Sequence, residues 1–500
     1  MMMCLPNNQT FLRAGQWLLS GCVVAILTGC NLAPDYKRPE SPVSAQWPDM
    51  PRVTYDQNAS MSTLSQQPAS AVAAEDRSGA DIGWRTVFMD PRLQALIQTG
   101  LDNNRDLRIA VARVDQARAQ YGVQRGALFP QIGAGIQGSR QRTPADLAMV
   151  GADAGVLSGQ AQAGIALTSF EIDLFGRLRN LSEAAWQNYL ASEESARTVQ
   201  LSVVSEIANA YFRLRSADDL LVLVEQTLKS RKDSLDLVTR RFEAGVASEL
   251  DVNQAKTLLD AASADLASFS RQRAQALNLL VLLIGQPLPD NLPEPAPFVR
   301  EQVLTGIPVG LPSDLIARRP DIRGAENALL AANANIGAAR AAFFPTISLT
   351  GAFGTASQSL GGLFKAGSTA WTFTPALNVP IFSGGSLQSQ LDFANASNQA
   401  AIAQYERTIQ RAFREVADAL AGEATFTSQI DAALAQQVAA GKTLNLSNLR
   451  YAAGIDSYLQ VQTAQVEYFT AQKLLVQARY NALANRVEFY KALGGGWIEK

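Results

Sequence analysis

The chain has 500 residues, 47% hydrophobic and 18% charged, and its formal net charge of −2 argues against a general nucleic-acid binder, which normally carries a basic surplus. Histidine is absent and all three cysteines, Cys4, Cys22 and Cys30, lie in the first 30 residues. Histidine-dependent catalytic triads, histidine-ligated metals and a disulfide framework in the body of the protein are therefore excluded, and we expect no catalytic residues, no cofactor and no metal site.

The first thirty residues have the pattern of a secretory signal. Arg13 is the only charged side chain before residue 30, and the apolar stretch 14–27 that follows it is too short to span a bilayer. The stretch ends in Leu27-Thr28-Gly29-Cys30, which is similar to the bacterial lipobox, where the cysteine becomes the acylated first residue of the mature protein. We predict a lipoprotein signal peptide over residues 1–29 and lipidation of Cys30.

Two alternatives for the N-terminus stay open. The sequence Leu19-Ser20-Gly21-Cys22 has the same form but leaves only a few apolar residues before cleavage, and a plain signal peptide would leave the cysteine unmodified. Asn31 stands where an aspartate tends to retain such lipoproteins in the inner membrane, which favours the outer membrane. Residues 30–80 lack periodicity, and we expect an acylated, mostly extended surface segment.

The rest of the chain contains two tandem copies of one unit. Residues 103–108 (Asn-Asn-Arg-Asp-Leu-Arg) align with residues 318–323 (Arg-Arg-Pro-Asp-Ile-Arg) at an offset of 215, and 241–245 align with 450–454 at 209. A single loop can absorb the difference of six residues. The chain therefore divides into a first repeat at 81–290, a linker at 291–312, a second repeat at 313–493 and a tail at 494–500.

Each copy is predicted to contain a β-hairpin. In the second copy Ile347, Leu349 and Phe353 alternate with serine, threonine and glycine, which is the period-two pattern of a strand with one apolar face. The strands are expected at about 130–142, 163–174, 345–355 and 370–382, and Gly/Ser/Ala-rich loops at about 143–162 and 356–369 join them in pairs.

Helices are predicted before and after each hairpin. Residues 91–128 recur at helical spacing until Phe129-Pro130, and long helices are expected at about 176–243, 248–284, 385–452 and 456–493. In the second long helix of each copy a heptad seam is rich in small residues: Ala255, Leu259, Ala262, Leu266, Phe269, Ala276 and Leu280, then Ala464, Tyr468, Ala471, Leu475, Ala478 and Ala482. An ordinary helix bundle, the alternative, has much shorter helices.

Four amphipathic strands are too few to close a barrel by themselves. Their length and alternation match outer-membrane barrels, and an open sheet edge cannot lie in lipid, so other copies of the chain must complete the sheet. Three copies give twelve strands, although the arithmetic also permits two or four. A soluble β-sandwich patch is the alternative. We predict an α+β membrane protein.

Four motifs carry a family resemblance. They are Leu311-Pro312-Ser313-Asp314-Leu315, the run from Arg318 to Glu326, Ala244-Gly245-Val246-Ala247-Ser248, and residues 490–497 at the C-terminus. Together they look like the signature of the outer membrane factor family of OprM- and TolC-like efflux channels, of the NodT type, and the likeness covers essentially all of the mature chain. The lipobox and the Arg-Arg-Pro-Asp-Ile-Arg run favour its drug-efflux lipoproteins.

This resemblance implies an architecture and partners. It implies a homotrimer with a 12-stranded transmembrane β-barrel in the bacterial outer membrane, long coiled-coil helices that form a periplasmic α-barrel, and a mixed equatorial region. It also implies docking to a periplasmic membrane-fusion adaptor and an inner-membrane resistance-nodulation-division pump. The expected function is a passive exit duct for drugs and other small molecules, with covalent lipid on Cys30 in place of any cofactor.

The helix turns at Gly245 and Gly454 are expected to form the periplasmic tip. The resemblance implies that rings of side chains close this tip, and by motif position these are Arg450, Tyr451, Asp456 and Leu459, with Asp251 from the first copy. Simple seam packing of the leucine and a solvated arginine are the alternatives. Gln460 and Thr463 replace aspartates that related channels often carry, which puts an acidic ring there in doubt.

Other interpretations compete with the efflux channel. A type I protein-secretion exit channel would share the architecture, and a periplasmic coiled-coil scaffold lipoprotein would have no pore. The cluster from Arg318 to Arg323 could bind phosphate, but a helix start with structural ion pairs is favoured because Pro320 lies within it. Trp371 fits either an interfacial aromatic belt or a packed core.

Overall fold

The computed structural model describes residues 31–48, 52–53, 64–65, 81–144, 156–298, 302–304 and 306–496. The predicted signal peptide, Cys30 and the last four residues lie outside this part of the chain. The chain forms two compact units: unit 1 comprises residues 1–39, 114–192 and 325–405, and unit 2 comprises 40–113, 193–324 and 406–500. Within the described residues, none of the helices is both long enough and apolar enough to traverse a bilayer.

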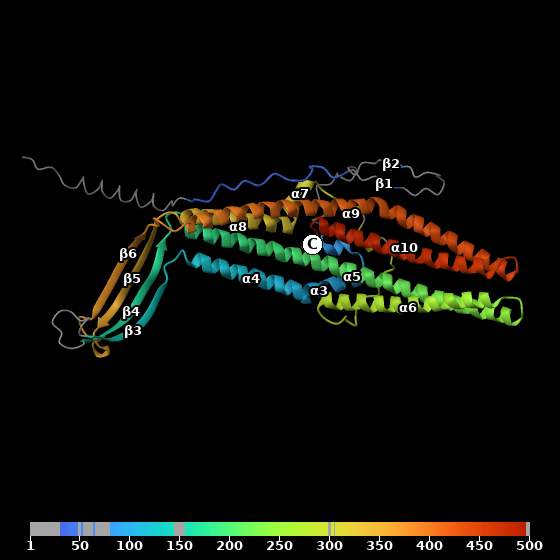
Figure 1. Cartoon of the computed structure of the whole chain (residues 1–500), viewed down its shortest axis with the longest axis horizontal. Coiled ribbons are helices and arrows are strands. Elements are labelled where there is room, and N and C mark those ends of the chain that lie inside the picture. The colour runs from blue at the N-terminus through green and yellow to red at the C-terminus, as the bar shows by residue number, and fades with distance from the viewer. Residues whose placement is uncertain are drawn as a thin grey trace, which may run out of the picture. The chain divides into compact units, whose positions relative to one another are not determined.

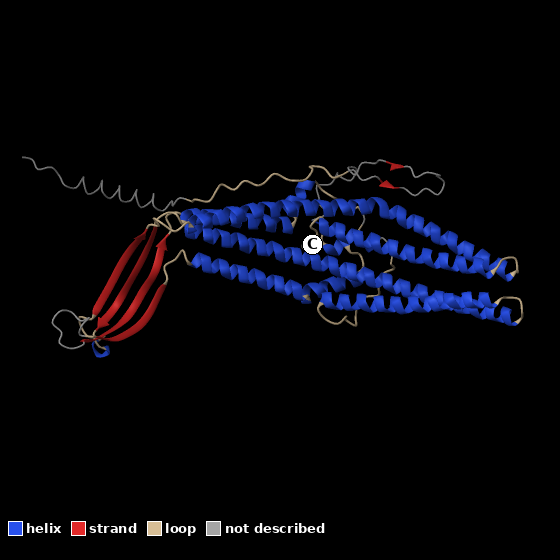
Figure 2. Ribbon diagram, in the orientation of Figure 1, coloured by secondary structure: helices blue, strands red, loops and turns tan. Residues whose placement is uncertain are grey.

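Unit 1 contains one antiparallel sheet of four strands (Figure 2). The strands are β3 (Ile132–Thr143), β4 (Val156–Ile172), β5 (Thr346–Ser357) and β6 (Thr369–Asn378), in the order β3-β4-β5-β6. β3 with β4 and β5 with β6 are the two predicted hairpins, and β4 pairs with β5 along the line where the repeats meet (Figure 1). In this sheet only β4 and β5 have two neighbours, so β3 and β6 are edge strands.

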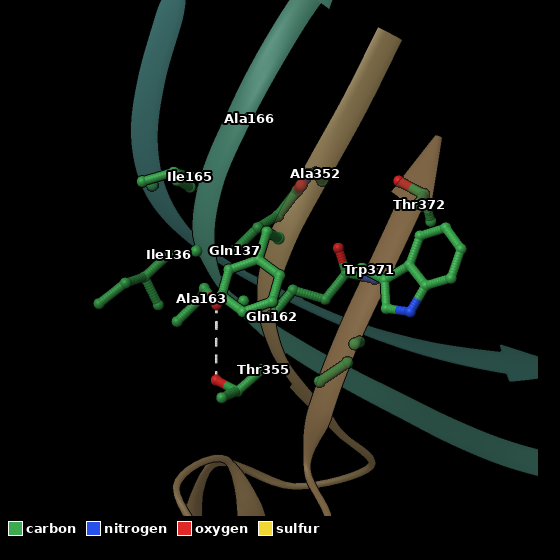
Figure 3. A pocket seen from close by; sticks show the side chains of 16 residues that line it. Ile136, Gln137, Gln162, Ala163, Ile165, Ala166, Ala352, Thr355, Trp371 and Thr372 are labelled. Carbon is green, nitrogen blue, oxygen red and sulfur yellow. Dashed lines mark hydrogen bonds between the residues drawn. The ribbon is translucent and has the colours of Figure 1, made fainter. Parts of the chain in front are cut away.

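The register gives the sheet one apolar face. Ile165 of β4 lies opposite Phe353 of β5, which lies opposite Trp371 of β6, and all three side chains are exposed. Most residues on the other face are glycine, alanine, serine, threonine and glutamine, with Glu171 and Asn378 near the strand ends. Figure 3 shows part of the sheet, where the hydroxyl of Thr355 donates to the carbonyl of Ala163 at 3.4 Å. Trp371 is 73% exposed, so it is not a core residue within the described chain.

A β-bulge keeps the apolar face continuous along β4. The apolar residues change from odd to even positions between Leu167 and Phe170, and the pairing with β5 shifts at that point. Two residues of β4 there oppose Thr350 alone, and Ser169 adopts a left-handed φ of 46°. The extra residue restores Phe170 to the face of Leu167, as bulges do when they redirect a strand.

The join between the repeats depends on two paired glycines. Gly164 of β4 lies opposite Gly354 of β5, and a Cβ on Gly164 would lie 2.8 Å from the Cα of Gly354. No side chain fits such an approach without separating the strands.

We expect the substitution Gly354→Ala to destabilise the sheet by about 2 kcal/mol, because the new Cβ meets the backbone of β4. Gly135→Ala is the matched control, since a Cβ there has nothing within 4 Å. Urea unfolding followed by β-sheet circular dichroism measures both variants, and an equal loss in the two would contradict the role of the glycine pair.

The helices repeat with the offsets seen in the sequence. In the first copy they are α3 (Pro91–Asn103), α4 (Arg105–Gly126), α5 (Arg177–Glu243) and α6 (Glu249–Ile284). In the second they are α7 (Pro312–Arg318), α8 (Pro320–Ala341), α9 (Ser386–Ala452) and α10 (Tyr458–Ala492). α5 and α9 each have 67 residues, about 100 Å at the rise of an α-helix. The predicted α+β class, with a hairpin and long helices in each repeat, is confirmed.

The single helix predicted over 91–128 is wrong, because the chain breaks at Asn104 and the second segment ends at Gly126. The backbone of Asn104 is extended (ψ 132°), its side-chain oxygen accepts from the amide of Leu107, and its Nδ2 donates to the carbonyl of Leu283. This break corresponds at offset 215 to the one at Arg319 between α7 and α8, where Pro320 begins the new helix.

Two strand boundaries differ from the prediction by four residues or more, and two short strands pair where none was predicted. β4 begins at Val156 instead of about 163, because residues 158–163 contain only serine, glycine, glutamine and alanine and give a weak strand signal, although they pair with β3. β6 ends at Asn378 instead of about 382, shortly before Pro380, which lacks the amide hydrogen that a ladder needs. In the segment expected to be extended, Arg52–Val53 (β1) pairs with Leu64–Ser65 (β2).

The main core lies in unit 2. Most of its buried members come from the short helix α2 (Trp84–Val87) and from α3, α5, α6, α9 and α10, with Trp84, Ile207, Leu280 and Tyr490 among the largest. Within the predicted linker, Val303 forms a bridge with Phe88, so part of the linker is ordered against this core. Most of the heptad seam is buried as well: Ala255, Ala262, Phe269, Ala276, Leu280, Ala464, Ala471, Leu475, Ala478 and Ala482.

Candidate functional site

The two helix turns of unit 2 have the same backbone geometry. Gly245 and Gly454 have φ of +74° and +73°, a left-handed conformation that glycine adopts at low cost. The amide after each glycine donates to the carbonyl of the arginine four residues before that glycine, at 2.8 Å for Arg241 and 2.9 Å for Arg450. This is the Schellman arrangement that ends a helix, and it reverses the chain into α6 and α10.

The side chains that stabilise the two turns are different. Ser248 and Asp251 form a capping box at the start of α6, in which each side chain binds the backbone amide of the other residue. Gln460 stands at the position of Asp251 in the second copy, and Ser457 makes no side-chain cap. The second turn instead has an ion pair between Arg450 and Asp456.

The ion pair of the second turn is bidentate. Nε of Arg450 lies 2.5 Å from one oxygen of Asp456, and Nη2 lies 3.0 Å from the other. The hydrogen bond from Arg450 lowers the pKa of Asp456 below its ordinary value, and the same bond raises the pKa of Arg450. The side chain of Arg450 is 54% exposed, so the pair lies at the surface of this turn.

Arg241, the counterpart of Arg450 in the first copy, contacts Tyr451 beside the turn between α9 and α10. Its guanidinium carbon lies 4.6 Å from the ring centre of Tyr451, and its Nη1 donates to the carbonyl of Tyr451 at 3.4 Å. The ring of Tyr451 also packs edge-on against Tyr458 at 5.5 Å. The cation–π interaction connects α5 with α9, and the aromatic pair connects α9 with α10.

Each turn also presents a pair of aliphatic side chains to solvent. Val246 and Leu250 are exposed at the first turn, and Ile455 and Leu459 are exposed at the second. The two pairs occupy the same positions in the repeat, at an offset of 209. Exposed aliphatic side chains that recur on two neighbouring turns are a feature of interaction surfaces.

The structure brings together only some of the residues predicted to close the tip. Arg450 and Asp456 are paired, and Leu459 is exposed beside them. Tyr451, however, is only 7% exposed, because it packs against Arg241 and Tyr458, and Asp251 caps α6. Sequence reasoning missed Arg241, although its repeat position relative to Arg450 was a usable signal.

No metal centre is formed by the described residues, in which no three acidic or cysteine side chains gather. Gln460 and Thr463, the two α10 residues that stand where related channels often carry aspartates, are both exposed. The hydroxyl of Thr463 donates to the carbonyl of Leu459. The exposed face of this part of α10 is therefore polar and uncharged at these positions.

Ion pairs account for the charged run before and within α8. Arg318 pairs with Asp81, and Arg323 lies 2.7 Å from Glu194 of α5. Arg319 is buried and contacts three groups: the carboxylates of Asp321 and Glu415, at 2.7 and 2.9 Å, and the carbonyl of Ala492, at 2.7 Å. The interpretation of this run as a helix start with structural ion pairs is confirmed.

Comparison with known proteins points to one family. A model described as outer membrane efflux protein matches residues 96–286 and 311–495, one match for each repeat. The probable efflux pump outer membrane protein TtgC of Pseudomonas putida is 45% identical over 484 residues, which cover 97% of this chain and 96% of TtgC. Outer membrane protein OprJ of Pseudomonas aeruginosa is 40% identical over 485 residues, with 96% of both chains covered.

Solved structures of membrane proteins have the same fold as this chain. The open state of the MtrE outer membrane channel of Neisseria gonorrhoeae superposes with a TM-score of 0.80 at 37% identity, covering 94% of this chain and 99% of MtrE. A membrane protein of Pseudomonas aeruginosa gives a TM-score of 0.82 at 39% identity, covering 93% and 100%. On this evidence, the chain belongs to the outer membrane efflux protein family.

Proposed function

We propose that the chain is the outer-membrane channel of a tripartite efflux system, a passive trimeric duct through which drugs and other small molecules leave the cell. An inner-membrane pump of the resistance-nodulation-division class delivers them through a periplasmic adaptor, and the duct itself performs no catalytic step. Relatives described as efflux pump outer membrane proteins, TtgC among them, support this function.

One observation carries the proposal: the sheet has an exposed apolar face and two edge strands. β3 and β6 have 12 and 10 residues, long enough to cross a membrane in a tilted barrel. Their outer backbone groups need partners in lipid, and neighbouring copies of the chain supply them. Three copies of the four-stranded sheet give 3 × 4 = 12 strands, an even number that suits a bacterial barrel.

The long helices also support assembly with other copies. On α9 of unit 2, four large apolar side chains are exposed on the single chain: Leu434, Val438, Leu446 and Leu449. Their spacing places them along one side of the helix, as in a packing seam. In the proposed trimer the helices of neighbouring copies cover this side and together enclose the periplasmic part of the duct.

We propose that the aliphatic pairs of the two turns bind the adaptor. Val246 with Leu250 and Ile455 with Leu459 offer two equivalent exposed patches on each copy, hence six in a trimer. A partner with helical hairpins and small apolar tips fits such repeated patches. Leu459 and the Arg450–Asp456 pair lie at the same turn. We therefore propose that they also close the pore before the adaptor binds.

Lipid anchoring is a further part of the proposal. The lipobox ending at Cys30 supports acylation of this cysteine, and the localisation of relatives named as outer membrane proteins supports the outer membrane as the destination. Acyl chains add membrane affinity but form no pore.

Planar-bilayer recording of the purified protein tests the function. We expect stepwise single-channel currents that continue without nucleotide or any other energy source, because a duct only permits diffusion. A purified oligomer that inserts but never conducts, even with the double substitution Arg450→Ala and Leu459→Ala at the tip, would contradict the channel and favour the scaffold lipoprotein. Co-purification with an ABC exporter would favour the secretion channel instead.

A further inference from the structure

One face of α8 in unit 1 carries a row of four residues with an unusual set of partners. Glu326, Asn333, Gly337 and Arg340 follow one another at spacings of seven, four and three residues, which places them along one side of the helix. All four contact residues 32–38 of the same chain, which we call the strap. The strap lies in the blue part of the ribbon in Figure 1.

The strongest contact of the strap is at Glu326. Nε and Nη2 of Arg38 each lie 2.7 Å from one oxygen of this carboxylate, a bidentate geometry, and the hydroxyl of Tyr36 donates to it at 3.1 Å. The side chain of Glu326 is only 14% exposed, so the ion pair is partly shielded from water. Bidentate arginine–carboxylate pairs of this kind fix orientation as well as adding energy.

The other polar contacts hold the strap by its backbone. Nδ2 of Asn333 donates to the carbonyl of Pro34 at 2.8 Å, and Nη1 of Arg340 donates to the carbonyl of Leu32 at 3.3 Å. Main-chain recognition of this type depends on the path of the strap more than on its side chains.

Gly337 lets the strap approach the helix closely. A Cβ at this position would lie 2.7 Å from the backbone nitrogen of Ala33 and 2.7 Å from Nδ2 of Asn180 on α5. No real side chain fits these distances, so glycine is required for the strap to occupy its place.

The strap and the row of contact residues on α8 have about the same length. Residues 326–340 of a helix span about 21 Å at 1.5 Å per residue, and the six steps from 32 to 38 span about 20 Å in an extended chain. The strap therefore runs antiparallel to α8 in register, with Arg38 at Glu326 and Leu32 at Arg340.

This direction determines where the N-terminal end of the strap is held. Arg340 is the second-last residue of α8, which ends at Ala341, and the chain enters β5 at Thr346. Cys30 precedes Leu32 by only two residues in the sequence. The strap thus approaches the helix end from which the chain passes directly into the sheet.

We infer that the α8 face formed by Glu326, Asn333, Gly337 and Arg340 is a docking site for the strap, and that its role is to hold the acylated end of the chain beside the start of β5. The inference rests on the lipid anchoring proposed above. It also accounts for Glu326, the last residue of the charged signature run, which none of the ion pairs around Arg319 explains.

Limited trypsin digestion of the purified full-length oligomer tests the docking. Trypsin cuts the bond after Lys37, whereas the bond after Arg38 resists because Pro39 follows it. We expect the Lys37 bond to be cut about tenfold faster in Glu326→Gln and in Gly337→Val, since cleavage follows the population of the released strap. Glu183→Gln is the matched control, an exposed glutamate of α5 in unit 1 that does not contact the strap, and it should cleave at the wild-type rate.

A cross-link tests whether the N-terminal end of the strap lies beside the end of α8. Leu32→Cys with Arg340→Cys should join within one chain through a short bis-maleimide, and adding Glu326→Gln should reduce the yield severalfold. Unchanged cleavage in both Glu326→Gln and Gly337→Val, or a cross-link insensitive to Glu326→Gln, would overturn the docking and leave the channel proposal intact. A released peptide 30–37 without acyl mass would overturn the anchoring role, while the conductance measurement judges the duct separately.

Discussion

The substitution Arg319→Ala is expected to lower the free energy of unfolding by about 3 kcal/mol, the cost of removing one partner of a buried ion pair. Arg319 is buried and its guanidinium binds two carboxylates, those of Asp321 and Glu415, together with the carbonyl of Ala492. Alanine leaves the two carboxylates close together without a cation between them. One side chain thus connects the start of α8 with α9 and with the end of α10.

The neighbouring arginine provides a matched control. Arg318 pairs with Asp81, but both side chains are well exposed, at 38% and 45%, so Arg318→Ala should cost no more than about 0.5 kcal/mol. Urea unfolding of the detergent-solubilised protein, followed by helical circular dichroism, measures the difference between the two variants. Equal losses would show that burial of Arg319 contributes nothing beyond an ordinary surface pair.

The second large effect is expected on the pore at acid pH. The hydrogen bond from Arg450 holds the pKa of Asp456 below its ordinary value of 3.8, so the pair is complete above that value and is lost as the pH falls through the lowered pKa. In the proposed trimer, loss of the pair should raise the open probability about two- to fivefold for each copy. Because three copies close one pore, the total increase should reach about tenfold or more.

Variants separate the pair from other acid effects. Asp456→Asn should show the raised open probability at neutral pH and no further rise on acidification, and combining it with Arg450→Ala should add nothing. Asp251→Asn is the control, because that carboxylate caps α6 and is not part of the pair. Single-channel recording between pH 7 and pH 3 measures all four proteins. A steep acid response that persists in Asp456→Asn would exclude this pair as its origin.

The repeat, the hairpins and the long helices could be predicted because their periods extend over many residues. α5 and α9 begin and end at positions 209 apart, and the ends of each lie within one residue of the predicted range. Strand β4 was predicted too short because in residues 157–163, Leu-Ser-Gly-Gln-Ala-Gln-Ala, the residues that alternate with serine and glutamine are, after Leu157, only glycine and alanine, which give a weak strand signal although the segment pairs with β3. Pairing with a neighbour, which a single sequence segment does not encode, decided their structure.

The break at Asn104 could have been found from the repeat. Its counterpart at offset 215 is Arg319, which directly precedes Pro320, and a proline at the first position of a helix is a recognised start signal. The helix start at Pro320 in the second copy therefore predicts, at the same offset, a helix start at Arg105 in the first.

The sequence predicted which residues lie at the helix turns, but it did not predict which distant residues they contact. Arg450 and Asp456 are close in sequence, and an ion pair across one turn needs no long-range information. Tyr451 lies against Arg241, 210 residues earlier, and Glu326 binds Arg38, 288 residues earlier. Contacts across such distances depend on how helices pack, and residue types alone do not specify which arginine meets which ring or carboxylate.

The central claim is that one chain supplies too little sheet and must share a barrel with identical copies. Native mass spectrometry of the protein extracted from outer membranes tests it most directly. The claim predicts a single species of three chains, each with the mass of the polypeptide from Cys30 plus its acyl groups. A stable monomer would contradict the claim, and an oligomer of any other number would contradict the trimer.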